Sequence, residues 1–260
     1  MVAEDTNDYA ALFDDIKAIV FDLDGTLYQY KADIRHYYDS TAGQTITDFG
    51  ATKTQAEGTA LARQSYDETG SSMIVPAAIV GKPVEELLYA FNRNLLPEHT
   101  VEISRRAAQE RHLLEALQAR TKLAILSHST EEVIHRTLAY IAMDDLFHPV
   151  IGIDNVGFSM KNHEKTPFLH ILEQLDLAPH EVLFVEDSPE NCFHPKELGM
   201  RTALIKYGLY DKEEHRTIGY NRYIDGRFEN LFHFLHRADK HIHTPDKTPH
   251  PAATVHPPHL

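Results

Sequence analysis

The stretch V20-F-D-L-D-G-T26 decides both the fold and the chemistry that the chain can support. It ends the apolar run 16–22, whose length and β-branched residues are typical of a buried strand. Asp22 and Asp24 close this run with one residue between them. Residues two apart in a strand point to the same face, so both carboxylates are expected to converge at the carboxyl end of the strand. Gly25 permits a sharp turn immediately afterwards.

The composition suits one large domain, or a core with an inserted subdomain. The chain has 260 residues, of which 42% are hydrophobic, and this is enough for a sizeable core. Its 25 Lys and Arg against 39 Asp and Glu give a net charge of −14, which argues against binding a nucleic-acid polymer. A small phosphorylated substrate is compatible with this charge, because its pocket needs only one or two cations.

The single cysteine, Cys192, excludes an intramolecular disulfide and favours a reducing compartment. The first fifteen residues are acidic and contain no apolar signal core, and no run of 18 apolar residues exists. A cytoplasmic location without a membrane span is therefore expected. The sequence leaves the oligomeric state open.

From residue 122 onward, apolar runs of strand length alternate with helical patterns and short loops. This order predicts an α/β fold, a Rossmann-like parallel sheet covered by helices on both faces. Strands are expected at 16–22, 122–127, 149–152, 181–186 and 201–206, and helices at 129–142, 168–175 and 228–237.

Residues 31–119 form successive amphipathic helical patterns and predict an α-helical cap inserted into the core. The core then comprises residues 16–30 and 120–238, after an N-terminal extension at 1–15. Residues 239–260, rich in Pro and His, are expected to be a disordered tail.

Two neighbouring carboxylates can take different roles in one reaction. One, left ionised, can attack an electrophile, and the other can act as a general acid. A phosphoryl group fits as the target, but a carboxylate at ~4 Å repels each phosphate charge by about 4 kcal/mol at an effective dielectric of ~20. The site then needs Mg²⁺ and a lysine. The alternative is that both aspartates are solvated turn residues.

Polar side chains also end the later strands of the predicted sheet. Ser127 ends the run 122–127, where its hydroxyl and the following amides can hold phosphate oxygens at a helix N-terminus. Asp187 follows Glu186 at the same edge, where a metal-binding carboxylate belongs, and Asn191 lies four residues on. Taken alone, Ser127 and Asp187 also fit ordinary helix caps.

These residues together resemble the haloacid dehalogenase superfamily of phosphatases. F21-D-L-D-G-T-L-Y28 is similar to its first motif, L123-A-I-L-S127 to its second and V185-E-D-S-x-x-N191 to its fourth. With the strands between them, these motifs cover roughly residues 16–30 and 120–206.

The resemblance implies roles for the aspartates. Asp22 is the expected nucleophile and forms an aspartyl-phosphate. Asp24 is expected to protonate the leaving alcohol and then to activate water. Asp22, the backbone carbonyl of Asp24 and Asp187 are the expected Mg²⁺ ligands.

The phosphate-binding lysine of the family's third motif is ambiguous in this sequence. Counting back without gaps from V185-E-D-S188 reaches Asn162, which cannot carry the charge. Lys161 lies one position away and is favoured, because a loop is expected to leave the sheet edge there. Lys165 is the rival, next to Thr166 at the start of a helix.

A helical cap in this position closes over the site and selects the substrate in the family. S65-Y-D-E-T-G-S-S72 and the first motif resemble the branch related to pyrimidine 5′-nucleotidases. Candidate substrate contacts are Tyr28, Tyr30, Arg63, Tyr66, Asn92, Arg93 and His128. Helix packing or a solvated face is the simpler explanation for any single one of the first six, and His128 equally fits a helix-start residue that contacts solvent.

The sequence thus predicts a Mg²⁺-dependent phosphomonoesterase that acts on a small phosphorylated metabolite. The substrate can be a pyrimidine nucleoside 5′-monophosphate, a sugar phosphate or phosphoglycolate. The alternative, motivated by the ambiguous lysine, is a catalytically retired member of the superfamily that binds or regulates.

Overall fold

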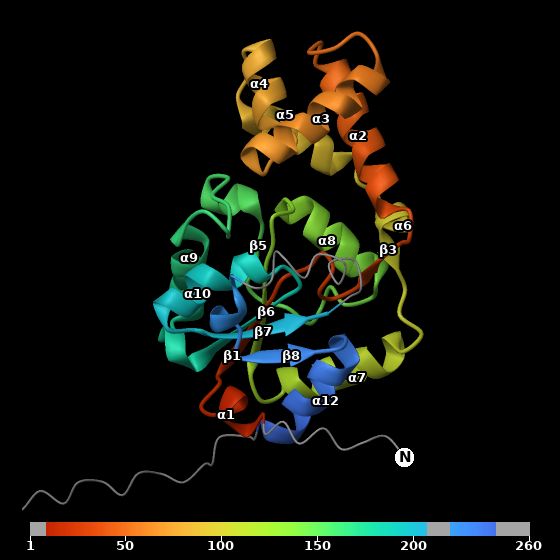
Figure 1. Cartoon of the computed structure of the whole chain (residues 1–260). Coiled ribbons are helices and arrows are strands. Elements are labelled where there is room, and N and C mark those ends of the chain that lie inside the picture. The colour runs from red at the N-terminus through yellow and green to blue at the C-terminus, as the bar shows by residue number, and fades with distance from the viewer. Residues whose placement is uncertain (1–8, 207–218, 243–260) are drawn as a thin grey trace, which may run out of the picture.

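The structure, a computed structural model, describes residues 9–206 and 219–242 (Figure 1). Within these residues, six parallel strands form one sheet in the order β5-β4-β1-β6-β7-β8, which confirms the predicted α/β fold. The first strand along the chain therefore lies inside the sheet. The strands are β1 (Ala18–Phe21), β4 (Lys122–Leu126), β5 (Val150–Ile151), β6 (Val182–Glu186), β7 (Arg201–Ile205) and β8 (Gly226–Phe228).

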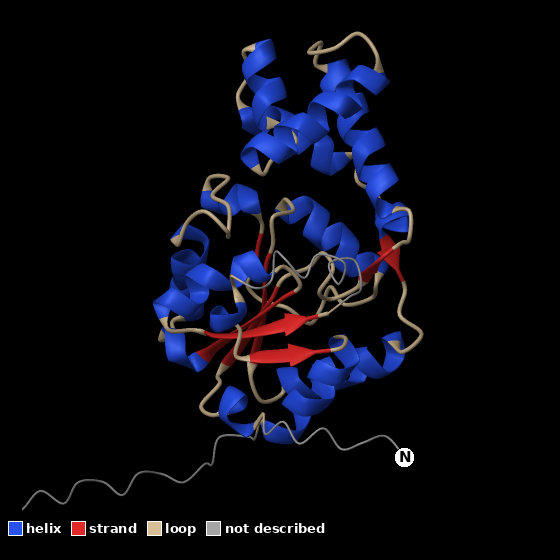
Figure 2. Ribbon diagram, viewed as in Figure 1, coloured by secondary structure: helices blue, strands red, loops and turns tan. Residues whose placement is uncertain are grey.

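Helices cover both faces of this sheet (Figure 2). Ile19 and Phe21 of β1 pack into the core on the side of α7, α8 and α12, whereas Ala18 and Val20 pack into the core on the side of α9. Complete burial of a side chain such as Phe21 contributes about 1.5–3 kcal/mol. The helices around the sheet are α1 (Ala10–Phe13), α7 (Ala107–Gln118), α8 (Glu131–Tyr140), α9 (Thr166–Leu175), α10 (Phe193–Leu198) and α12 (Leu231–His241).

The C-terminal part of the core differs from the prediction. Phe228, expected to start a helix, is the last residue of the edge strand β8. Helix α12 begins at Leu231, because the side chain of Asn230 accepts a hydrogen bond from the His233 amide and caps it. This helix extends to His241 and so includes the first residues of the expected tail; residues 243–260 lie outside the described ranges.

Part of the N-terminal extension belongs to the core. Leu12 and Phe13 of the short helix α1 are buried, and Phe13 packs against Phe234 of α12 with ring centroids 5.9 Å apart. Helix α7, which falls within the range 31–119, packs against α12 and β4. Its position is therefore on the sheet rather than among the helices above it (Figure 1).

A second group of helices lies above the carboxyl ends of the central strands (Figure 1). An antiparallel pair of two-residue strands, β2 (Gln29–Tyr30) and β3 (Val101–Glu102), joins it to the core. Its apolar residues, among them Ile46, Met73 and Leu87, form a cluster separate from those on the sheet. The helices are α2 (Ile34–Asp48), α3 (Gln55–Thr69), α4 (Ile74–Val80), α5 (Val84–Arg93) and α6 (Pro97–Thr100).

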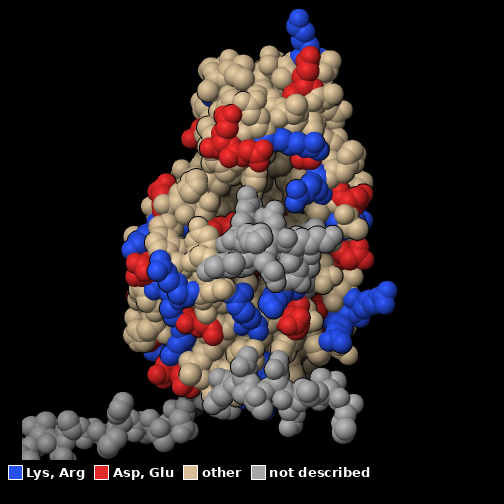
Figure 3. Space-filling model, in the orientation of Figure 1, with Lys and Arg blue, Asp and Glu red and all other residues tan. Residues whose placement is uncertain are grey.

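Acidic and basic side chains are interspersed on the face of the molecule drawn in Figure 3. Such a mixture differs from the clustered positive charge that binds a phosphate backbone. None of the helices in the described ranges is long and apolar enough to cross a membrane.

Two glycines allow helices α2 and α3 to approach closely. A Cβ on Gly58 would lie 2.3 Å from the backbone oxygen of Gly43, and a Cβ on Gly43 would lie 2.2 Å from the side-chain oxygen of Thr59. Because the obstacle to Gly58 is backbone, a methyl group there forces the two helices apart.

We expect Gly58→Ala to lower the free energy of unfolding by about 1–3 kcal/mol, the usual cost of overpacking. Alanine would otherwise stabilise a helix by about 1 kcal/mol relative to glycine, so the sign of the change reports the close contact. Urea unfolding followed by circular dichroism measures it. Gly219→Ala, where a Cβ would have no neighbour within 4 Å among the described residues, is the control. A Gly58→Ala protein as stable as the parent contradicts the close packing.

Candidate active site

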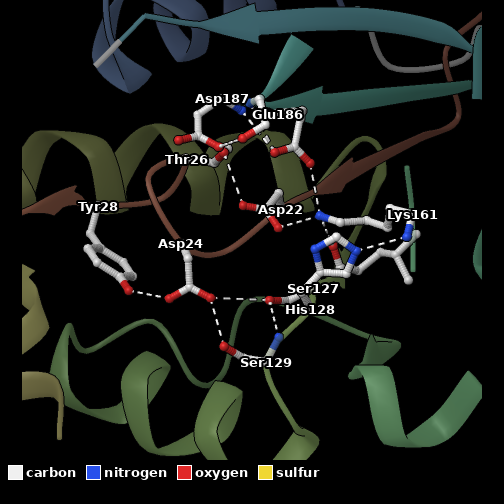
Figure 4. Close-up of polar contacts among 12 residues, drawn as sticks. Asp22, Asp24, Thr26, Tyr28, Ser127, His128, Ser129, Lys161, Glu186 and Asp187 are labelled. Carbon is white, nitrogen blue, oxygen red and sulfur yellow. Dashed lines mark hydrogen bonds and ion pairs between the residues drawn. The ribbon is translucent and has the colours of Figure 1, made fainter. Parts of the chain in front are cut away.

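Three adjacent strands deliver polar residues to one edge of the sheet (Figure 4). Asp22 follows β1, Ser127 follows β4, and Asp187 follows Glu186 at the end of β6. The amide of Asp22 donates to the carbonyl of Val185 at 2.9 Å, which continues the sheet pairing to the first aspartate. The residues that follow these three strands therefore meet at one edge of the sheet, as expected for Asp22, Ser127 and Asp187.

Asp22, Glu186 and Asp187 form a buried carboxylate cluster, with one oxygen from each within 4.8 Å of the others. Burial and the neighbouring charge of Glu186 raise the pKa of Asp22 to about 8, against the opposing effect of Lys161. The same two causes raise the pKa of Asp187 well above its ordinary value. Converging buried oxygens with this mutual repulsion fit a hard divalent cation such as Mg²⁺.

Gly25 lets the chain turn tightly against this cluster. Its φ of 82° lies in the left-handed region, and a Cβ there would stand 2.3 Å from Oδ2 of Asp187. Glycine is therefore required both for the backbone conformation and for space beside the carboxylate.

Lys161 lies between two of these carboxylates. Its Nζ donates to Oδ1 of Asp22 at 2.5 Å and to Oε2 of Glu186 at 2.8 Å, and only 1% of the residue is exposed. Burial opposes its charge, but Asp22 and Glu186 outweigh that effect and raise the pKa of Lys161. Lys165 is exposed at the N-terminus of α9. Of the two lysines that the sequence left open, Lys161 is the one that the fold brings to Asp22.

His128 holds the backbone of the lysine. Its Nε2 accepts a hydrogen bond from the amide of Lys161 at 2.8 Å, and an accepting nitrogen carries no proton. Burial, followed by the charge of Lys161, lowers the pKa of His128 well below its ordinary value. His128 is thus a neutral anchor for the loop that carries Lys161.

Asp24 is turned away from the carboxylate cluster (Figure 4). One of its oxygens accepts a hydrogen bond from the hydroxyl of Tyr28, and the other accepts from Ser127 at 3.3 Å and Ser129 at 2.8 Å. The two aspartates therefore have different environments. The carboxylate of Asp24 is not part of the cluster, whose third carboxylate is that of Glu186, and Glu186 accepts a hydrogen bond from Lys161.

Ser129 was missed by the sequence analysis. S129-T-E-E132 has the form of a capping box, but α8 begins at Glu131 after Thr130, whose side chain makes no capping hydrogen bond. The hydroxyl of Ser129 instead donates to Asp24. Only its closeness to Ser127 at the strand end pointed to the site.

A cavity of about 350 Å³ lies between the sheet edge and the helices above it. Asp22, Asp24 and Asp187 line its floor, together with Lys161 and Asn191. The expected substrate contacts that line it are Tyr30, Tyr66, Asn92 and His128.

The other expected contacts lie elsewhere. Tyr28 is buried against Asp24, and Arg63 pairs with Asp39 at 2.6 Å on the surface of the upper helices. Arg93 is exposed at the C-terminal end of α5.

A sequence model of the haloacid dehalogenase-like hydrolases matches residues 16–192. The chain belongs to this family. The match confirms the superfamily that the motifs predicted, and with it the prediction that this protein is an enzyme.

Curated relatives carry the name phosphoglycolate phosphatase. The protein from Aquifex aeolicus is 27% identical over 194 residues, which cover 74% of this chain and 86% of the relative. The protein from Psychrobacter arcticus is 21% identical and covers 86% of this chain and 97% of its own. These names do not point to the pyrimidine 5′-nucleotidase branch.

Solved structures share the fold. A haloacid dehalogenase phosphatase from Thermococcus onnurineus superposes with a TM-score of 0.59 at 19% identity, covering 85% of this chain and 97% of its own. L-2-haloacid dehalogenase from Xanthobacter autotrophicus gives 0.51 at 21% identity, with the same coverage.

Replacing Lys161 by methionine removes the cation from two buried carboxylates. Folding raises the pKa of such a buried carboxyl above its unfolded value of about 3.9. The free energy of unfolding therefore falls as pH rises from the unfolded pKa to the folded pKa. Lys161 limits this loss, so in chelator we expect the free energy of unfolding of Lys161→Met to fall more steeply with pH. The deficit should reach about 3 kcal/mol at pH 8. Urea unfolding across this range measures it.

Lys165→Met is the matched control, because Lys165 is exposed. Its stability should stay within about 0.5 kcal/mol of the parent at every pH. Parallel pH profiles for Lys161→Met and the parent would refute the interaction.

Proposed function

We propose that this hydrolase is a Mg²⁺-dependent phosphomonoesterase that forms an aspartyl-phosphate on Asp22. One observation carries the proposal. The fold places Asp22 at the floor of a cavity in contact with Lys161, and places a second carboxylate, Asp24, in a separate hydrogen-bonded setting. Membership of the family and the names of the relatives support it.

In the first step, an oxygen of Asp22 attacks the phosphorus of the ester. A new bond joins this oxygen to phosphorus, and the bond from phosphorus to the alcohol oxygen breaks. Asp24, when protonated, gives its proton to the departing oxygen, so that the alcohol leaves as a neutral molecule.

In the second step, water attacks the phosphorus of the aspartyl-phosphate. Asp24, now a carboxylate, takes a proton from that water, and the bond between phosphorus and Asp22 breaks. Phosphate leaves, and both aspartates return to their starting states. One residue thus serves as acid and then as base, as microscopic reversibility requires.

The residues around Asp22 provide for the phosphate. Lys161 supplies a fixed positive charge, and we assign Ser127 to a phosphate oxygen once substrate displaces its hydrogen bond to Asp24. Asp22 and Asp187 are the proposed Mg²⁺ ligands, together with the backbone carbonyl of Asp24. When bound there, Mg²⁺ supplies positive charge that offsets the repulsion between carboxylate and phosphate.

We propose that helices α2–α6 act as the cap that covers the cavity and selects the alcohol part of the substrate. The cap surface of the cavity includes Tyr66, Met73 and Asn92, which present aromatic, apolar and amide groups. The substrate is a small phosphorylated metabolite. Nucleoside 5′-monophosphates, suggested by the motifs, and phosphoglycolate, suggested by the relatives' names, are the candidates to separate.

The first test is phosphate release from a panel of nucleoside 5′-monophosphates, sugar phosphates and phosphoglycolate, each with Mg²⁺ and with chelator. We expect release that requires the metal and falls at least about 10³-fold in Asp22→Asn, because the nucleophile is lost. Asp48→Asn, an exposed change at the end of α2, is the control. No release from any ester by folded protein, or full activity in Asp22→Asn, would favour a binding or regulatory role.

The raised pKa of Asp22, about 8, makes Mg²⁺ binding depend on pH. Below this value the cation must displace a proton, so its stabilising effect should grow as pH rises. We expect the increase in Tm produced by saturating Mg²⁺ to be larger at pH 8 than at pH 6 by at least about 2 °C. Differential scanning calorimetry measures both.

Asp187→Asn should remove most of this increase in Tm. An increase that is equal at the two pH values, or that survives Asp187→Asn, would argue against a metal in the carboxylate cluster.

A further inference from the structure

Hydroxyl groups on two separate elements hold the side chain of Asp24 from opposite sides (Figure 4). Tyr28, in the loop after β1, donates to Oδ1, and Ser129, in the loop after β4, donates to Oδ2 at 2.8 Å. A carboxylate held at both oxygens by donors on different loops has little freedom to rotate.

We propose that Tyr28 and Ser129 are positioning residues that fix Asp24 in the orientation from which it exchanges protons with the leaving group and with water. The inference rests on the proposed function, because it takes Asp24 to be the acid. It adds two residues that act on the reaction only through Asp24.

Tyr28 is itself fixed. Only 4% of the residue is exposed, and its ring meets that of Tyr30 edge to face at a centroid distance of 5.8 Å. An isolated backbone bridge links residues 24 and 28 and closes the intervening loop. The hydroxyl of Tyr28 therefore reaches Asp24 from a rigid support, so the hydrogen bond constrains the aspartate rather than following it.

Ser129 lies before α8 but does not cap it. The residue directly before this helix is Thr130, whose side chain makes no capping hydrogen bond, although a capping serine or threonine commonly stabilises a helix by about 1 kcal/mol. The hydroxyl of Ser129 donates to Asp24. Its amide in turn donates to the hydroxyl of Ser127 at 3.0 Å, which holds the residue in place.

This arrangement separates Asp24 from Asp22. Without the two hydroxyls, Asp24 could rotate toward the carboxylate cluster, where another negative charge is unfavourable and where it would no longer face the leaving group. The acid function should therefore weaken when either hydroxyl is removed, while attack by Asp22 is unchanged.

The test compares two phosphomonoesters that differ in their need for a proton. p-Nitrophenyl phosphate releases a stable anion and needs little help from an acid, whereas an alkyl phosphate needs the proton. For Tyr28→Phe and Ser129→Ala we expect kcat/KM to fall about tenfold or more with the alkyl ester and less than about threefold with the nitrophenyl ester.

Three further variants separate positioning from structural damage. Ser129→Thr keeps the hydroxyl and should restore most of the activity toward the alkyl ester. Tyr140→Phe, on the exposed surface of α8, should leave both rates unchanged. In an Asp24→Asn background, Tyr28→Phe should cause no further loss, because two residues that act through one group are not additive.

Equal losses with the two esters, or independent losses from Tyr28→Phe and Asp24→Asn, overturn the inference. If the parent hydrolyses both esters and depends on Asp22, such a result removes only the positioning role. If the parent releases no phosphate from either ester, or Asp22→Asn retains full activity, the proposed function itself fails.

Discussion

The site depends on the confinement of three buried carboxylates beside one buried ammonium group. Asp22, Glu186 and Asp187 are buried together and repel one another. Among the described residues, Lys161 is the one cationic side chain that pairs with Asp22 and Glu186. Such a cluster is unfavourable for stability on its own. The cluster forms nevertheless, because the pairing of β1 with β6 fixes the backbone that carries these side chains and keeps them close together.

The two aspartates of the first strand show how one short motif yields two chemical environments. Asp22 lies in the carboxylate cluster and contacts a lysine from a distant loop. Asp24 lies after the strand has ended and is surrounded by hydroxyl groups. The turn at Gly25 allows this separation within a few residues. Their alternation in sequence suggested a shared face, but the end of the strand sends the two side chains to different partners.

The sheet and most of the site could be predicted from the sequence, because both depend on local patterns. Apolar runs mark β1, β4 and β6, and polar residues at their ends must meet at one edge. The lysine could not be assigned, since Lys161 and Lys165 lie in a loop whose path depends on the contact with His128. Ser129 begins a capping-box pattern, and the sequence cannot show that its hydroxyl bonds Asp24 instead. Strand β8 was missed because it is short and is stabilised by pairing with β7.

The helices above the sheet have an apolar core that shares no residue with the two cores on the sheet, and only the β2–β3 ribbon leads into and out of them. Each part therefore has an apolar core of its own, and the two parts meet through side chains such as Arg136 of α8, which donates to the carbonyl of Leu95 at 2.7 Å. Another is Tyr89, whose ring centroid lies 5.3 Å from that of Phe158. A different helical bundle between residues 30 and 101 would have to replace these contacts, but it would not change the strand pairs that hold the carboxylate cluster. The polar groups at the strand ends and the helices that cover the cavity thus lie on parts of the chain with separate apolar cores.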